Sequence, residues 1–240
     1  IKDSDVCIVT SGIPRKPGMS RDDLVKTNAE VMKSVGAGIK QHAPNAFVIV
    51  ITNPLDAMAY LMQKVTGFSN SKVVGMAGVL DTARYQAHLA EEINVSNTSV
   101  SAFVLGGHGD TMVPVRSYTT CNGVPITNFI NNDKLTAIEN RVRNSGGEVV
   151  ALLKTGSAFY SPAASAILMA ESYLYDQKKM CAAAAYCDGQ YGVKGLYLGV
   201  PVIIGAKGVE KIIEIELTPE EKKLLATSIE AVKSIVTVLE

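Results

Sequence analysis

The sequence has no excess of charge of either sign. Among its 240 residues, 23 Lys and Arg balance 23 Asp and Glu, so the formal net charge is +0. Nucleic acids and anionic membrane surfaces attract proteins through a concentrated positive field, which this composition does not supply. We therefore expect no nucleic acid and no membrane among the partners of the chain.

Cysteine is also scarce. The four cysteines, Cys7, Cys121, Cys181 and Cys187, lack the C-x-x-C spacing of zinc sites and are too few for a disulfide scaffold. No signal peptide opens the sequence, and no apolar run approaches the roughly 20 residues of a membrane helix. These features predict reduced thiols, no metal site and a cytoplasmic protein.

Apolar runs alternate with helical patterns in the first third of the chain. Short apolar runs that end in turn residues are typical of strands buried on both faces of a parallel sheet, and we expect them at 6–10, 47–51 and 73–76. Apolar residues at helical spacing predict helices at 24–42 and 55–66 between these strands. The alternation predicts an α/β fold with a doubly wound parallel sheet.

From about residue 79 onward, short β-rich stretches mix with helices, as in an α+β domain. We therefore divide the chain into domains at residues 1–78 and 79–240. The elements expected in the second part are a helix to about 94, β-rich stretches at 98–105 and 112–119, helices broken at Gly146–Gly147 and at Gly156, a helix at 161–175, strands at 180–186 and 197–204, and a final helix after Thr218.

One histidine, His108, is surrounded by glycines at positions 106, 107 and 109. Because glycine has no side chain to pack and costs backbone entropy, this pattern indicates a backbone that comes close to a ligand. Upstream, Asp81 and Arg84 are three residues apart, which places a carboxylate and a guanidinium on one face of a helix. These residues would supply a proton carrier, a group that orients it and an anion clamp. The alternative is a glycine turn with a surface histidine and an ordinary exposed ion pair.

A loop at 13–23 follows the first expected strand and contains two prolines together with Arg15 and Arg21. Open α/β sheets bind ligands beyond the carboxyl ends of their strands, so both arginines are candidates for contact with a substrate. The alternative is that they are solvated loop charges. Asn53 ends the second strand before Pro54, a sequence that is also common where a strand simply stops.

Five segments, at residues 9–12, 13–21, 51–54, 80–84 and 106–110, occur in the order found in the lactate/malate dehydrogenase superfamily. The chain resembles this superfamily over essentially its whole length, and within it the malate dehydrogenases of the lactate-dehydrogenase-like bacterial type. The resemblance implies a partial Rossmann domain with strands four to six, followed by the α+β C-terminal domain of the superfamily.

The sequence departs from the family pattern in one respect. Dinucleotide-binding domains open with a strand, a G-x-G-x-x-G turn and a helix, followed by an acidic residue that binds the adenosine ribose. None of these features is found, since Gly36 and Gly38 fall within an expected helix. We therefore expect that the sequence begins at the fourth strand of the family fold and lacks the N-terminal βαβ segment that holds the adenosine half of NAD.

The resemblance also implies the roles of the site residues. His108 matches the proton acceptor and donor of the family, and Asp81 matches its carboxylate partner. Arg84 matches the residue that grips the C1 carboxylate of the substrate, a task for which the planar guanidinium is suited. Arg21 matches the arginine that polarises the reacting C–O bond. Arg15 occupies the position that reads the rest of the substrate, where malate enzymes carry Arg and lactate enzymes typically Gln.

The cofactor implied is NAD, lined by Asn28, Ile51, Thr52 and Asn53, with Asn53 also reaching the substrate. The implied activity is reversible hydride transfer between (S)-malate and NAD in the tricarboxylic acid cycle, which makes a small dicarboxylic 2-hydroxy or 2-oxo acid the partner. Family members commonly assemble, so a homodimer or homotetramer is expected. The alternatives are a lactate-type 2-hydroxyacid dehydrogenase and a non-catalytic fragment that keeps only the oligomerising domain.

Overall fold

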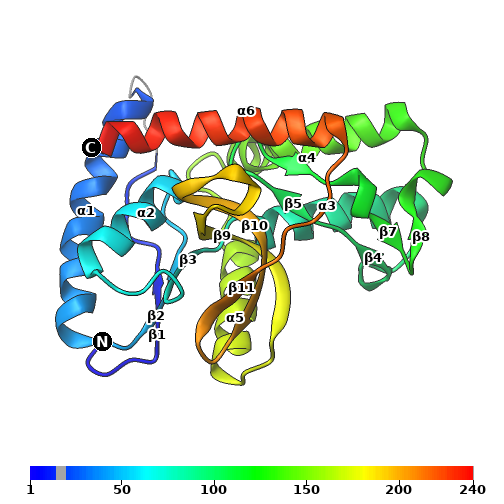
Figure 1. The fold of residues 1–240 in the computed structure, drawn as a ribbon. Helices are drawn as coiled ribbons and strands as arrows, with labels where there is room; N and C mark the ends of the chain where they lie inside the picture. Colours follow the sequence, from blue (N-terminus) through cyan, green and yellow to red (C-terminus); the bar gives the residue numbers. More distant parts are fainter. Residues whose placement is uncertain (15–19, 240) are drawn as a thin grey trace.

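The structure of the chain, a computed structural model, describes residues 1–14 and 20–239. A mixed sheet of six strands lies at its centre (Figure 1). In order across the sheet, the strands are β1 (Val6–Val9), β2 (Phe47–Val50), β3 (Val73–Gly75), β9 (Lys179–Asp188), β10 (Lys194–Gly205) and β11 (Gly208–Ile212).

Six α-helices and several short elements complete the described chain. The helices are α1 (Arg21–His42), α2 (Leu55–Thr66), α3 (Gly78–Ile93), α4 (Asn132–Leu153), α5 (Tyr160–Leu174) and α6 (Pro219–Val236). The short strands are β4 (Val100–Ser101), β5 (Val104–Leu105), β6 (Val113–Pro114), β7 (Thr120–Cys121) and β8 (Val124–Pro125), and the short 3₁₀ helices are η1 (Asn97–Ser99), η2 (Arg116–Tyr118), η3 (Ile126–Asn128), η4 (Gln190–Gly192) and η5 (Thr237–Leu239). None of the described helices has the length and apolar character needed to cross a bilayer.

The first three strands form the parallel half of the sheet. Val6 of β1 lies opposite Phe47 of β2, and Val48 of β2 lies opposite Val73 of β3. All four residues of β2 are buried, as expected for a strand that is covered on both faces. The predicted α/β class and the three predicted strands are confirmed, with each strand ending one residue earlier than expected.

The other half of the sheet comes from the end of the chain. β9 joins β3 in antiparallel orientation through Gly75 and Ala184, and β10 and β11 follow as antiparallel neighbours. A Cβ at Gly75 would lie 2.9 Å from the Cβ of Ala184, so glycine allows the two strands to approach. The sheet thus contains strands from both sides of residue 79. The division into domains at 78/79 stays a prediction from the sequence pattern.

The prediction that Gly146–Gly147 would break a helix is wrong. Both glycines lie inside α4, which continues to Leu153 before Lys154 turns the chain with a φ of 60°. A glycine in a helix costs only about 1 kcal/mol relative to alanine, and packing against a neighbouring helix outweighs such a cost. Leu135, Ile138 and Val142 of α4 belong to a second core that also includes residues of α3.

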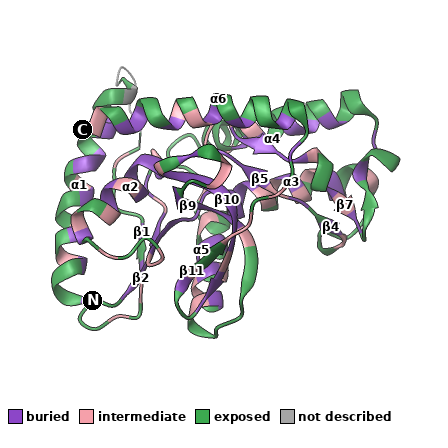
Figure 2. Cartoon of the chain, in the orientation of Figure 1, coloured by how far each residue is buried: buried purple, intermediate pink, exposed green. Residues whose placement is uncertain are grey.

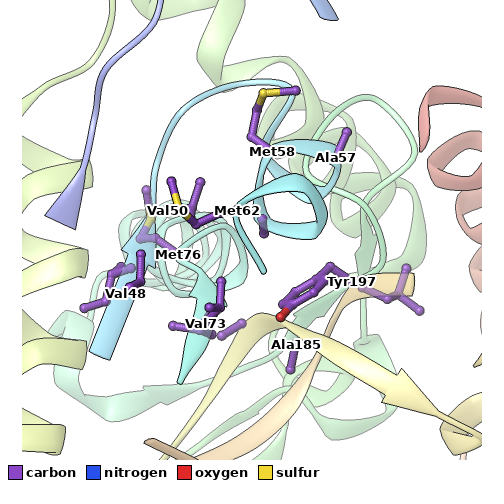
Figure 3. Packing of buried hydrophobic residues seen from close by; sticks show 14 of the residues in the cluster. Val48, Val50, Ala57, Met58, Met62, Val73, Met76, Ala185 and Tyr197 are labelled. Atoms are coloured by element: carbon purple, nitrogen blue, oxygen red, sulfur yellow. The ribbon is translucent and has the colours of Figure 1, made fainter. Parts of the chain in front are cut away.

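Burial is concentrated along the central sheet and on the inner faces of the helices that cover it (Figure 2). In this core, Val48 and Val73 of the parallel strands pack together with Met62 of α2 and Tyr197 of β10 (Figure 3). The long helix α6 crosses one side of the molecule and reaches α1 at its carboxyl end (Figure 1). This helix begins after Thr218, as its sequence predicts, and Thr218 and Glu221 form a capping box at its start.

Candidate active site

The centre of the candidate site is an ion pair between His108 and Asp81. Asp81 lies in the first turn of α3, where the positive end of the helix dipole favours a carboxylate, and its side chain is only 2% exposed. Its Oδ2 lies 2.7 Å from Nδ1 of His108, and its Oδ1 lies 3.7 Å from Nη1 of Arg84. The structure thus brings together the three residues that the sequence places on the helix and in the glycine-rich turn.

The carboxylate of Asp81 determines how His108 handles protons. Burial lowers the pKa of His108, but the charge of Asp81 and its hydrogen bond raise the pKa by more, so that the net shift is upward. Because a carboxylate only accepts, Nδ1 of His108 donates to Asp81. The other ring nitrogen, Nε2, is then the atom that takes or gives a proton.

A second buried carboxylate, Asp56, lies behind His108. Its Oδ2 accepts a hydrogen bond of 2.9 Å from the backbone N–H of His108, and its Oδ1 has no hydrogen-bond partner among the described residues. Burial raises the pKa of Asp56 to about 6. No motif in the sequence points to Asp56, and its one signal is that it is an acidic residue in the otherwise apolar first turn of α2. Asp56 connects the end of β2, where Asn53 lies, to the histidine.

The loop that carries His108, residues 106–112, is also held by α6. The Oγ of Ser228 accepts a hydrogen bond of 2.8 Å from Gly107 N–H and lies 3.1 Å from the Oγ1 of Thr111. Gly106 pairs with Gly199 of β10 through two backbone hydrogen bonds of 2.8 and 3.0 Å. We call residues 106–112 the His108 loop.

The structure gives a different reason why glycine is needed at two of the three positions around His108. A Cβ at Gly106 would lie 2.5 Å from Oγ of Ser228, and a Cβ at Gly107 would lie 2.5 Å from a methyl group of Val232. Gly106 also has a φ of 85°, a conformation that favours glycine. These two glycines therefore allow close approach of α6, and not of a ligand as the sequence analysis expected. Among the three, Gly109 faces open space.

The carboxyl ends of β1 and β2 form the other side of the site. Asn28 accepts from Ile13 N–H at 2.8 Å and donates to the carbonyl of Asn53 at 2.7 Å, while Thr52 Oγ1 donates to the carbonyl of Ser11 at 2.7 Å. The polar groups of Asn28 and Thr52 thus fix the two strand ends to each other. The side chain of Asn53 is exposed at this edge, and Ile51 is half-buried.

These strand ends have the position and the polar groups of a ligand-binding edge. Open α/β sheets bind ligands at this edge, and the exposed Asn53 offers an amide with both donors and an acceptor. Arg15 and the side chain of Arg21 lie outside the described residues, so their predicted contacts with the substrate remain predictions. Among the residues that are described, no group of His, Cys, Asp and Glu is arranged to hold a metal ion.

Two family descriptions match the chain and together account for most of it. The lactate/malate dehydrogenase NAD binding domain matches residues 1–75, and the lactate/malate dehydrogenase alpha/beta C-terminal domain matches residues 78–239. The chain is also 60% identical over 233 residues to malate dehydrogenase 1 of Anaeromyxobacter dehalogenans (strain 2CP-C), a match that covers 97% of this chain and 75% of that protein.

Solved structures share the fold of the chain at lower identity. Malate dehydrogenase from Cryptosporidium parvum has a TM-score of 0.95 at 45% identity, with 98% of this chain and 77% of that chain covered. A lactate dehydrogenase from the same organism, described as a complex with lactic acid and NAD, has a TM-score of 0.95 at 47% identity, with 99% and 77% covered. The same backbone is therefore shared by enzymes that are named for two different substrates.

Proposed function

The chain belongs to the lactate/malate dehydrogenase family, and from this premise we propose that it catalyses reversible hydride transfer between (S)-malate and NAD, which gives oxaloacetate. The observation that carries this proposal is the 2.7 Å contact between His108 and the buried Asp81, with Arg84 beside it. Such a pair is suited to proton transfer at near-neutral pH.

In the proposed mechanism, NAD supplies the hydride chemistry when it is bound, and the chain positions the substrate and moves the proton. Arg84 binds the C1 carboxylate through its planar fork. Nε2 of His108 accepts the hydroxyl proton of malate, and the charge of Asp81 stabilises the imidazolium that results. In the reverse direction the imidazolium returns this proton to the reduced oxaloacetate. Arg21 is proposed to polarise the C–O bond during both steps.

The nicotinamide half of NAD is proposed to lie at the ends of β1 and β2. Asn53 would contact both cofactor and substrate, and Ile51 would offer an apolar surface. Asn28 and Thr52 support this surface through the bonds that fix the strand ends. With malate as substrate, we place the reaction in the tricarboxylic acid cycle. The described cysteines are free thiols, which is consistent with a reducing, cytoplasmic environment.

Arg15 is proposed to choose malate over lactate. A guanidinium paired with the distal carboxylate of the substrate forms a charge-assisted bond, and loss of one partner of such a pair costs about 2–5 kcal/mol. We expect Arg15→Gln to lower kcat/KM for oxaloacetate by about 30- to 5,000-fold while pyruvate is used as well as before or better. NADH absorbance, followed with oxaloacetate and with pyruvate in the wild type and in Arg15→Gln, gives kcat/KM for each substrate.

Arg141→Gln is the matched control, because Arg141 is an exposed arginine of α4 outside the site. This variant should use both substrates as the wild type does. Equal losses for oxaloacetate and pyruvate in Arg15→Gln would contradict the proposed role of Arg15. A wild type that prefers pyruvate would instead favour the lactate-type alternative, and one that oxidises NADH with neither acid would favour the non-catalytic alternative.

We further propose that the chain forms a homodimer or homotetramer through α5. Tyr160, Ile167 and Leu174 are spaced by seven residues on one face of α5 and are all exposed. The adjoining groove of about 420 Å³ between α3, α5 and β9 is lined largely by apolar side chains such as Leu168 and Val79. Large exposed apolar patches mark interaction sites. Because the formal net charge of the chain is +0, two copies do not repel each other through their net charge.

A charge placed in this face should weaken the assembly. We expect the wild type to elute as a dimer or tetramer in light-scattering chromatography, and Ile167→Glu to shift it toward smaller species. Leu224→Glu, on α6, is the control, because Leu224 is exposed to a similar extent, 45% against 52% for Ile167. A monomeric wild type, or an assembly that is insensitive to Ile167→Glu, would contradict the proposed surface.

A further inference from the structure

We infer that Ser228 of α6 is a positioning residue for the reaction: it holds the His108 loop so that the imidazole stays aligned with Asp81. The inference rests on the proposed function only for its kinetic readout. The contacts that carry it belong to this chain alone.

The hydroxyl of Ser228 joins the two ends of the His108 loop. It accepts from Gly107 N–H at 2.8 Å and lies 3.1 Å from Oγ1 of Thr111, and Ser228 is fully buried. A hydroxyl has one donor and two acceptor sites, so one group can serve both contacts. Removal of the hydroxyl would leave the buried N–H of Gly107 without an acceptor among the described residues, which a folded protein tolerates poorly.

The shape of the loop makes its position sensitive to this contact. At Gly106 and Gly107 the space that a Cβ would need is taken by Ser228 and Val232, so the loop backbone lies directly on α6. No side chain of these two glycines separates loop and helix. A small movement at Ser228 therefore passes to the backbone that precedes His108.

Three helices together set the orientation of the imidazole. Ser228 of α6 holds the N–H of Gly107, Asp56 of α2 holds the N–H of His108, and Asp81 of α3 holds the ring. Of the three anchors, Ser228 alone is uncharged. Its removal leaves the charges of Asp56, Asp81 and Arg84 around the ring in place, so that an effect on His108 would report alignment and not a lost charge.

The test compares Ser228→Ala with Ser234→Ala. Ser234 is an exposed serine of the same helix that donates only to the carbonyl of Ala231, and its replacement should change nothing. For Ser228→Ala we expect kcat with oxaloacetate to fall by about 10- to 100-fold, because small misplacements of catalytic groups cause losses of this size. Binding of NADH, measured by fluorescence, should stay the same. In an NMR titration without cofactor, the pKa of His108 should fall toward its ordinary value as the bond to Asp81 loosens.

The inference would be overturned if Ser228→Ala melts at a lower temperature but keeps the wild-type kcat and the wild-type pKa of His108. Ser228 would then have a structural role only. If Ser228→Ala does not fold, Thr111→Val, which keeps the shape and removes the other hydroxyl, should shift both quantities in the same direction by a smaller amount. No shift in that variant would also overturn it. A shifted pKa of His108 in an enzyme inactive toward oxaloacetate would refute the proposed function and still support the positioning role.

Discussion

Replacement of His108 with asparagine should lower kcat for oxaloacetate by about 10²–10⁴-fold, the usual contribution of a positioned acid–base group. Asparagine cannot exchange a proton at near-neutral pH, whereas the pKa of His108 is raised by Asp81. Affinity for NADH should be retained, because the imidazole is assigned to the substrate side of the site. Single-turnover absorbance measurements and fluorescence titration of NADH give the two quantities.

Asp81→Asn should also reduce kcat steeply, but the two changes together should cost little more than His108→Asn alone. Residues that act as one unit show such non-additivity, since the carboxylate has no task once the imidazole is gone. The pH dependence adds a second readout. Reduction of oxaloacetate needs the imidazolium, so its rate falls as pH rises through the pKa of His108, and Asp81→Asn should move this fall to lower pH. A double variant that loses the full product of the single effects would refute the pairing.

Asp56 gives the second large effect, on stability. Burial raises its pKa from 3.8 to about 6 in the folded protein, so the folded state binds the proton more tightly than the unfolded state. The contribution of this group to the free energy of unfolding is therefore present below about pH 4 and is lost as pH rises through about 6. With about 1.4 kcal/mol for each pKa unit, the loss amounts to about 3 kcal/mol.

Asp56→Asn removes this pH-dependent loss while an amide oxygen can still accept from His108 N–H. Between pH 4 and pH 7, the stability of the variant relative to the wild type should therefore increase by about 3 kcal/mol in urea unfolding. Asp56→Ala leaves the His108 N–H unpaired and should lower kcat as well. Asp133→Asn, in the exposed first turn of α4, is the control and should follow the wild type at each pH. Parallel curves for Asp56→Asn and wild type would show that the pKa of this carboxyl group is not raised in the folded protein.

The parts of the site that could be predicted are those in which the types of neighbouring residues and their spacing indicate the chemistry. Asp81 and Arg84 are neighbours on one helical turn, and His108 stands out because it is set among glycines. The helix that starts after Thr218 was predictable because its capping residues act locally.

The parts that could not be predicted depend on contacts between distant segments. Ser228 lies 121 residues after Gly107, and nothing near either residue in the sequence indicates that they meet. The glycines at 106 and 107 were correctly singled out, but the helix that requires them lies at the other end of the chain. Likewise, the pairing of Gly75 with Ala184, which merges the two halves into one sheet, has no local signal.

This shared sheet constrains how the enzyme can move. Many two-lobed enzymes expel water by rotation of one lobe about a hinge. Here such a rotation would shear β9 away from β3 and break the pairing at Gly75 and Ala184 beneath the site. The ends of β1 and β2 and the helix that carries Asp81 are therefore fixed in one rigid frame. Any motion that exposes or covers the histidine therefore has to leave this pairing intact, and its free-energy cost is separate from that of unfolding the core.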